Sequence, residues 1–163
     1  MSNAGTLTVT TPSDTEIVLT RVFDAPRHLV FAALTKPELL KRWFGARGWD
    51  LVDCQVDLRV GGAWRFVSRG PDGMDMGQRG VYREIMPPDR LVYTEVFDDQ
   101  SYPGETLITT VLVEQHGRTT MTSTVRYATQ EGRDIVLSYP MARGVGESYD
   151  RLAELLSTES TGS

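Results

Sequence analysis

Cysteine and histidine are scarce in this 163-residue sequence, which has Cys54 as its single cysteine and His28 and His116 as its two histidines. A single cysteine cannot form an internal disulfide, so we expect a reducing compartment, the cytoplasm. The two histidines lie far apart and have no neighbouring cysteines, which argues against a zinc site. The sequence also lacks a phosphate-binding glycine loop, a dinucleotide fingerprint and a G-x-S-x-G motif. We therefore expect no metal, no other cofactor and no assembled set of catalytic residues.

Long apolar runs and an excess of positive charge are missing as well. No run reaches the roughly 18 apolar residues that a membrane-spanning helix needs, and the N-terminus lacks the basic and apolar regions of a signal peptide. The formal charge of −5, from 17 basic and 22 acidic residues, provides no general attraction to nucleic-acid phosphates. We expect neither a membrane span nor a nucleic-acid partner.

The composition that remains is typical of one globular domain. Hydrophobic residues make up 40% and charged residues 24% of the chain. Small polar residues dominate both ends, so we expect a flexible N-terminal segment over residues 1–14 and a flexible tail over 158–163. The single domain is expected over residues 15–157.

Alternating patterns and turn signals predict seven strands that follow one another through short connections, which implies antiparallel neighbours. The expected strands are residues 16–23, 49–59, 63–69, 76–86, 90–98, 106–115 and 118–127. Two short helices are expected between the first and the second strand. Asp24 offers an N-cap to the first of these helices, and residues 35–38 have the spacing of a capping box for the second.

The C-terminal region, residues 131–156, has the apolar spacing of a long helix. The residues that form the stripe are Ile135, Ala142, Val145, Tyr149, Leu152 and Leu156. Pro140 interrupts this pattern, because proline lacks an N–H donor and its ring crowds the preceding turn. The helix either kinks or breaks at Pro140, and of the two we expect a break, with a short helix from about residue 130 to 139 followed by the main helix. Gly144 and Gly146 either leave volume for a ligand or relieve crowding near Pro140.

Several segments resemble those of one known family. They are residues 21–26 (RVFDAP), 30–31 (VF), 35–38 (TKPE), 43–45 (WFG), 57–62 (DLRVGG), 80–85 (GVYREI), 141–145 (MARGV) and 149–152 (YDRL). In this order they resemble bacterial proteins named after the activator of the heat-shock-protein-90 (Hsp90) ATPase. These belong to the SRPBCC superfamily, which includes START domains and birch-pollen-allergen-like proteins. The resemblance spans residues 16–156.

The resemblance implies an α+β helix-grip fold, in which a curved seven-stranded antiparallel sheet surrounds the long C-terminal helix. Such a fold leaves an apolar cavity between sheet and helix, where a small hydrophobic or amphipathic molecule would bind. The candidate ligand-binding residues are Trp43, Phe44, Trp64, Phe66, Tyr82, Tyr93, Glu95, Phe97, Met121, Met141, Val145 and Tyr149. The alternative is that these side chains simply fill a packed core.

The sequence leaves two polar features open, namely the pair of Asp57 and Arg59 and the direction in which Glu95 points. Asp57 and Arg59 point the same way on a strand, so they either anchor a ligand or fix the hairpin beside Gly61 and Gly62. Glu95 shares a strand face with Tyr93 and Phe97. If that face points inward, Glu95 is a carboxyl group in apolar surroundings with a raised pKa.

Three functions follow, and binding of a small ligand without catalysis is the leading hypothesis. A second is an enzyme of the cyclase or dehydratase type, with Tyr82, Tyr149 or Glu95 as acid or base. A third is an interaction module associated with the Hsp90 chaperone, which the resemblance implies only weakly. The subunit number is left open, with a homodimer among the assemblies considered.

Overall fold

The protein is described from a computed structural model that covers residues 7–99, 102 and 104–161. In chain order the elements are β1 (Thr8–Thr10), β2 (Glu16–Phe23), α1 (Arg27–Thr35), α2 (Pro37–Trp43), β3 (Asp50–Val56), β4 (Ala63–Arg69), β5 (Asp75–Met86), β6 (Arg90–Phe97), β7 (Thr106–Gln115), β8 (Arg118–Arg126), α3 (Gln130–Leu137) and α4 (Met141–Thr161). This order and its antiparallel curved sheet confirm the predicted α+β helix-grip fold.

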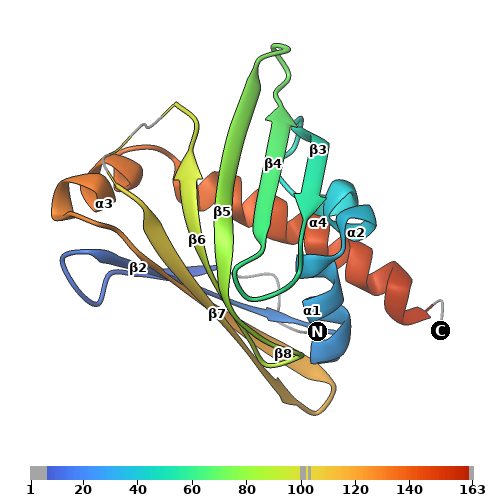
Figure 1. Cartoon of the computed structure of the whole chain (residues 1–163). Coiled ribbons are helices and arrows are strands. Elements are labelled where there is room, and N and C mark those ends of the chain that lie inside the picture. Colours follow the sequence, from blue (N-terminus) through green and yellow to red (C-terminus); the bar gives the residue numbers. More distant parts are fainter. Residues whose placement is uncertain (1–6, 100–101, 103, 162–163) are drawn as a thin grey trace.

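All strands belong to one antiparallel sheet with the order β1-β2-β8-β7-β6-β5-β4-β3. The strands from β3 to β8 form a meander, and β2 joins it by pairing with β8, with Ile17 opposite Val125. Figure 1 shows the bent sheet with α4 running across one of its faces. Helices α1 and α2 gather at one end of α4, and α3 lies at the other.

The prediction of seven strands is wrong by one, because the described residues form eight. The extra strand, β1, pairs with β2 and places Thr8 opposite Thr20. It lies in the segment that we expected to be flexible, of which residues 1–6 lie outside the described residues. A strand of three residues is too short to show a clear alternation of apolar and polar side chains. It is recognised in the structure by its pairing with β2.

Both predicted caps of the short helices are wrong. The N-cap of α1 is Pro26 rather than Asp24, and α2 begins at Pro37 with Lys36 as its N-cap. Thr35 still belongs to α1, and its hydroxyl donates to the carbonyl of Phe31 at 2.9 Å. The Thr35 side chain is therefore unavailable as a cap for the next helix.

The C-terminal helical region breaks at Pro140, as predicted. Helix α3 begins after Thr129, whose hydroxyl accepts from the backbone N–H of Gly132 at 3.0 Å. Helix α4 begins at Met141 and continues to Thr161, through four of the six residues that we expected to form a tail. Residues 162–163 of that tail lie outside the described residues.

Helix α4 buries one side against the concave face of the sheet. Leu152, Leu155 and Leu156 are buried in the larger apolar cluster, which also contains residues of α1, α2 and several strands. The predicted stripe holds at Leu152 and Leu156 but fails at Ala142, which is exposed. Burial at positions 152, 155 and 156 fixes this end of the helix, which packs against α1 and α2, and the part of α4 nearer Met141 lines an open space.

Candidate ligand-binding site

A cavity of about 660 Å³ lies between the sheet and α4, within the range of small-molecule binding sites. All twelve candidate residues line it. They come from the end of α2 (Trp43, with Phe44 next in the chain), β4 (Trp64 and Phe66), β5 (Tyr82), β6 (Tyr93, Glu95 and Phe97), β8 (Met121) and α4 (Met141, Val145 and Tyr149). The structure thus brings these residues together around one space, and their contact with a ligand stays a prediction.

The aromatic side chains form a continuous wall. Phe44 packs edge-on against Phe66 with ring centroids 5.0 Å apart, and Phe66 lies 4.9 Å from Trp64. Trp64 in turn contacts Tyr93 at 5.7 Å. On the helix side, Tyr149 packs against Phe23 at 6.0 Å. These contacts hold the rings in fixed orientations, which reduces the entropy cost of ordering them around a ligand.

The two tryptophan N–H groups in this wall already have acceptors. Trp43 Nε1 donates to the carbonyl of Ala33 at 2.9 Å, and Trp64 Nε1 donates to the carbonyl of Thr94 at 3.2 Å. Each indole therefore needs no polar partner from a ligand. Trp43 is 3% exposed, so it forms part of the cavity wall.

Glu95 points inward with Tyr93 and Phe97, since all three line the cavity. Strand β6 pairs with β7 without a register shift. Side chains two residues apart on β6 therefore point to the same face of the sheet, as the sequence alternation predicts. Gln78 Nε2 donates to Glu95 Oε2 at 2.6 Å. Loss of water raises the pKa of Glu95 to about 7, and the Gln78 hydrogen bond acts in the opposite direction. The sequence-based expectation of a raised pKa for an inward-facing Glu95 is confirmed.

A row of hydrogen-bonded hydroxyl groups runs along the cavity wall from β6 to α4. The hydroxyls of Thr110 and Ser123 are 2.9 Å apart, on the paired strands β7 and β8. The Thr110 side chain hydrogen-bonds to Tyr93, and the Ser123 side chain hydrogen-bonds to Tyr149. Burial raises the pKa of both phenols, so they stay neutral near pH 7. These neutral hydroxyl groups can donate hydrogen bonds to a ligand or accept hydrogen bonds from it.

Ser68 adds a polar group without a partner. Its side chain is 2% exposed and lines the cavity, and its hydroxyl has no hydrogen-bond partner among the described residues. An unpaired buried hydroxyl costs free energy, of order 1–3 kcal/mol. A ligand atom or a water molecule in the cavity can supply the missing bond.

Several lining residues were not identified from the sequence. The polar ones include Ser68, Gln78, Tyr102, Thr110, Tyr127, Tyr139 and Ser148. Gln78 sits on β5 four residues before Tyr82 and on the same strand face, because the register shift in the pairing with β6 comes only after Tyr82. Alternation back from Tyr82 could therefore have identified Gln78. For Thr110, strict alternation with buried Ile108 and Leu112 was a signal that could have been used.

Other candidate features lie away from the cavity. Arg59 Nε donates to Asp57 Oδ2 at 2.9 Å, and the two side chains are 76% and 50% exposed. This pair therefore fixes the hairpin, and its alternative assignment as an anchor inside the cavity is wrong. Gly144 lines the cavity, and a Cβ atom on it would meet no atom within 4 Å. Relief of crowding near Pro140 is therefore not the reason for this glycine.

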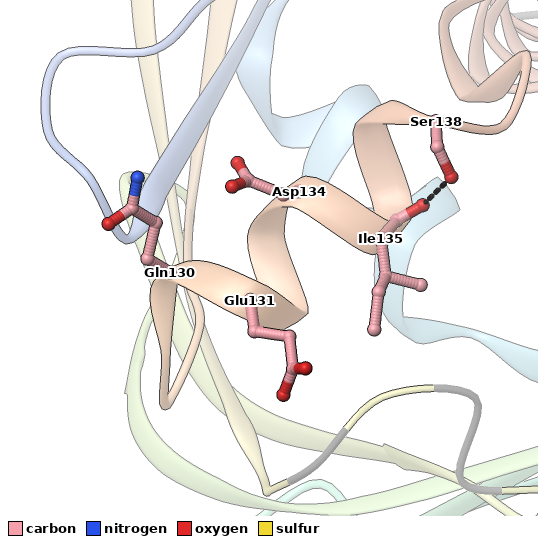
Figure 2. A pocket seen from close by; sticks show the side chains of 5 residues that line it. All are labelled: Gln130, Glu131, Asp134, Ile135 and Ser138. Atoms are coloured by element: carbon pink, nitrogen blue, oxygen red, sulfur yellow. Dashed lines mark hydrogen bonds between the residues drawn. The ribbon is translucent and has the colours of Figure 1, made fainter.

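A second depression of about 520 Å³ lies outside, on α3. Figure 2 shows its five lining side chains fanning out from the helix instead of converging. Ser138 Oγ donates to the carbonyl of Ile135 at 2.6 Å, so the hydroxyl proton of Ser138 is already used in a hydrogen bond within the helix. The lining also includes Gln130, Glu131 and Asp134. This depression offers no set of groups aimed at a common point.

The break between α3 and α4 lies at the rim of the cavity. Tyr139 lines the cavity although it is 60% exposed, and Pro140 and Met141 line it as well. The helix break predicted from Pro140 therefore lies where the cavity approaches solvent.

Comparisons with known proteins agree with this fold. The model of the family described as activator of Hsp90 ATPase homolog 1-like protein matches residues 24–157. The chain belongs to this family. A crystal structure of a protein from Rhodobacter sphaeroides is 36% identical, covers 94% of this chain and 99% of its own, and has a TM-score of 0.86.

Two more structures of similar fold extend this comparison. A protein from Nitrosomonas europaea is 27% identical, with 93% of this chain and 99% of that chain covered and a TM-score of 0.82. An HSP90 activator from Plasmodium falciparum is 23% identical over 69% of this chain and 72% of its own, with a TM-score of 0.55, which supports the fold alone. No match was found among curated proteins.

Two kinds of feature are missing from the described part of this family member. None of its helices there has the length and apolar character needed to cross a membrane. Among the same residues, no group of three or more His, Cys, Asp and Glu side chains is arranged to hold a metal ion.

Proposed function

We propose that the protein binds a small hydrophobic or amphipathic molecule in the cavity between the sheet and α4. The observation that carries this proposal is an aromatic-walled cavity of about 660 Å³ that the core side chains leave unfilled. Burying apolar ligand surface there contributes about 25 cal/mol per Å². The unpaired hydroxyl of Ser68 and the Glu95 carboxyl supply the few polar groups that orient ligands in such sites.

The test is to fill the cavity from the helix side. In a Val145→Trp variant the indole occupies ligand volume, since Val145 lines the cavity and is only partly buried. With 1-decanol as the probe, the wild type should gain thermal stability, by about 2.7 kcal/mol when the probe is at 100 times its Kd. The variant should fold with this gain abolished.

The matched control is Val113→Trp, which adds the same side chain at a position on β7 that is 52% exposed. This variant should keep the full response to 1-decanol. An unchanged response in Val145→Trp, or no response in the wild type, contradicts the proposal. Native mass spectrometry of protein purified from its own host would report a bound molecule and the subunit number together.

A catalytic role is a second candidate, favoured by the position of Glu95. A carboxyl group with a pKa of about 7 is suited to both accept and donate protons at neutral pH. Tyr149 and Tyr82 line the same cavity. Turnover of polyketide-like or aromatic substrates that disappears in Glu95→Gln would support a cyclase or dehydratase. Absence of turnover by the wild type over a broad panel would exclude it.

Association with Hsp90 is a third candidate, supported by the description of the family to which the chain belongs. Its test is the ATPase rate of purified Hsp90 with and without this protein. An increase that depends on concentration would support the role. An unchanged rate together with no binding in solution would rule it out.

A further inference from the structure

The cavity carries a single charged side chain among the described residues that line it, and that side chain is Glu95. No lysine, arginine or histidine of the described chain is part of this lining. The buried Arg21 lies near Tyr149 but is engaged by Asp150, with Nη1 to Oδ1 at 2.8 Å. The Glu95 carboxyl therefore lacks a cationic partner within the cavity wall.

The immediate partner of Glu95 satisfies only part of its hydrogen-bonding capacity. Gln78 donates one hydrogen bond to Oε2, and an amide brings no compensating charge. A carboxylate can accept about four hydrogen bonds through its two oxygens. The remaining capacity faces the cavity, because Glu95 lines it and is not fully buried.

Aromatic rings occupy the surroundings of this carboxyl. Burial is the main cause that raises the pKa values of Tyr93, Tyr127 and Tyr149, and the negative charge on Glu95 raises them further. All three phenols therefore lie within the electrostatic range of Glu95. Phe97 lies two residues along β6 on the same face. Ring faces attract cations through their quadrupole, most strongly where water is excluded.

A carboxyl without a counter-ion in a cavity lined by aromatic side chains selects against one kind of ligand and for another. A carboxylate or phosphate head would place like charges together in apolar surroundings, which is strongly unfavourable. An ammonium group brings the missing positive charge and up to three N–H donors. It also gains from the tyrosine rings around it.

We propose that the ligand is an amphipathic amine whose ammonium group pairs with Glu95 while its apolar body lies along Trp64, Phe66 and Phe44. This inference rests on the proposed function, since it names the ligand class of the same cavity. Alkylammonium groups ordinarily titrate near pH 10.4, well above the pKa of about 7 of Glu95. The proton therefore stays on the amine, and the bound pair is ammonium and carboxylate.

The test compares three probes with the same ten-carbon chain, namely decylamine, 1-decanol and decanoate, by titration calorimetry at pH 8. For the wild type we expect decylamine to bind at least tenfold more tightly than 1-decanol and decanoate to bind most weakly. In Glu95→Gln the preference for the amine over the alcohol should fall below about threefold. Binding of 1-decanol should persist in that variant.

The matched control is Glu38→Gln, which removes the same charge from an exposed position on α2 outside the cavity lining. It should retain the preference of the wild type and thereby exclude a general charge effect. The inference is overturned if wild-type protein binds 1-decanol or decanoate as tightly as decylamine, or if Glu95→Gln keeps the preference. In those cases binding of 1-decanol still supports the cavity, whereas failure of all three probes overturns both proposals.

Discussion

At the scale of single residues, Glu95 makes stability depend on pH. Its pKa rises from 4.5 to about 7 on folding, chiefly because the carboxyl loses water. Below pH 4.5 the group is protonated in both states and carries no penalty. As the pH rises towards 7, the unfolded chain ionises first, so the folded state loses relative stability. Above about pH 7 the loss is complete.

A Glu95→Gln variant removes this loss and keeps an acceptor for Gln78. We expect it to be more stable than the wild type at pH 8, by about 1–3 kcal/mol, and close to the wild type at pH 4.5. Urea denaturation at both pH values measures the difference. The exposed Glu38→Gln variant should show no comparable change. Equal effects of Glu95→Gln at the two pH values would contradict the assigned pKa.

Which residues share a strand face was readable from the sequence, whereas the direction of that face and the partners of its residues were not. Alternation along residues 90–98 was enough to put Tyr93, Glu95 and Phe97 on one strand face. Gln78 is 17 positions away from Glu95 and meets it only through the pairing of β5 with β6. Partners of this kind depend on register, and a single bulge changes the register without a local sequence signal.

At the scale of elements, one buried ion pair joins α4 to the sheet. Arg21 of β2 is 3% exposed, and its partner Asp150 of α4 is 50% exposed. The Arg21 guanidinium also lies over the ring of Phe23, 5.2 Å from its centroid. Loss of the carboxylate leaves a buried cation with less compensation, which is costly even where the intact pair contributes little.

We therefore expect Asp150→Ala to destabilise the protein by about 1–3 kcal/mol. The control is Asp89→Ala, which removes the partner of Arg27 from a pair whose side chains are 53% and 42% exposed. Exposed pairs of this kind contribute about 0–1 kcal/mol. Urea denaturation of both variants at pH 7 provides the comparison. If both variants lose the same free energy of unfolding, the burial of Arg21 does not determine the cost of removing its partner.

The boundaries of elements were predictable where the chain carries its own signal. The interruption between α3 and α4 was predictable from Pro140, whose ring and missing N–H kink or break a helix, and the structure has the break. The cap at Asp24 was wrong because Pro26 itself takes the N-cap position of α1. Strand β1 was missed since its three residues acquire their conformation by pairing with Leu19 and its neighbours.

At the scale of the whole molecule, the fold was predictable because several weak motifs occur in one order along nearly the whole chain. The cavity is harder to read, since the same aromatic stripe would fill a core if α4 lay closer to the sheet. Burial of Leu152 and Leu156 seats one part of the helix. The part that carries Val145 and Gly144 lines the open space instead. Only the packing of distant elements decides between these outcomes.

All three tryptophans of the chain, Trp43, Trp49 and Trp64, line the cavity, so intrinsic fluorescence reports on its contents. A small neutral quencher such as acrylamide reaches their rings through the unfilled cavity, and a bound ligand takes that space. Saturating 1-decanol should therefore lower the acrylamide quenching constant of the folded protein. In urea the three rings lie in an open chain, so 1-decanol should leave quenching unchanged there. A folded protein whose quenching ignores 1-decanol would place the probe outside the cavity, because no other tryptophan exists to mask the effect.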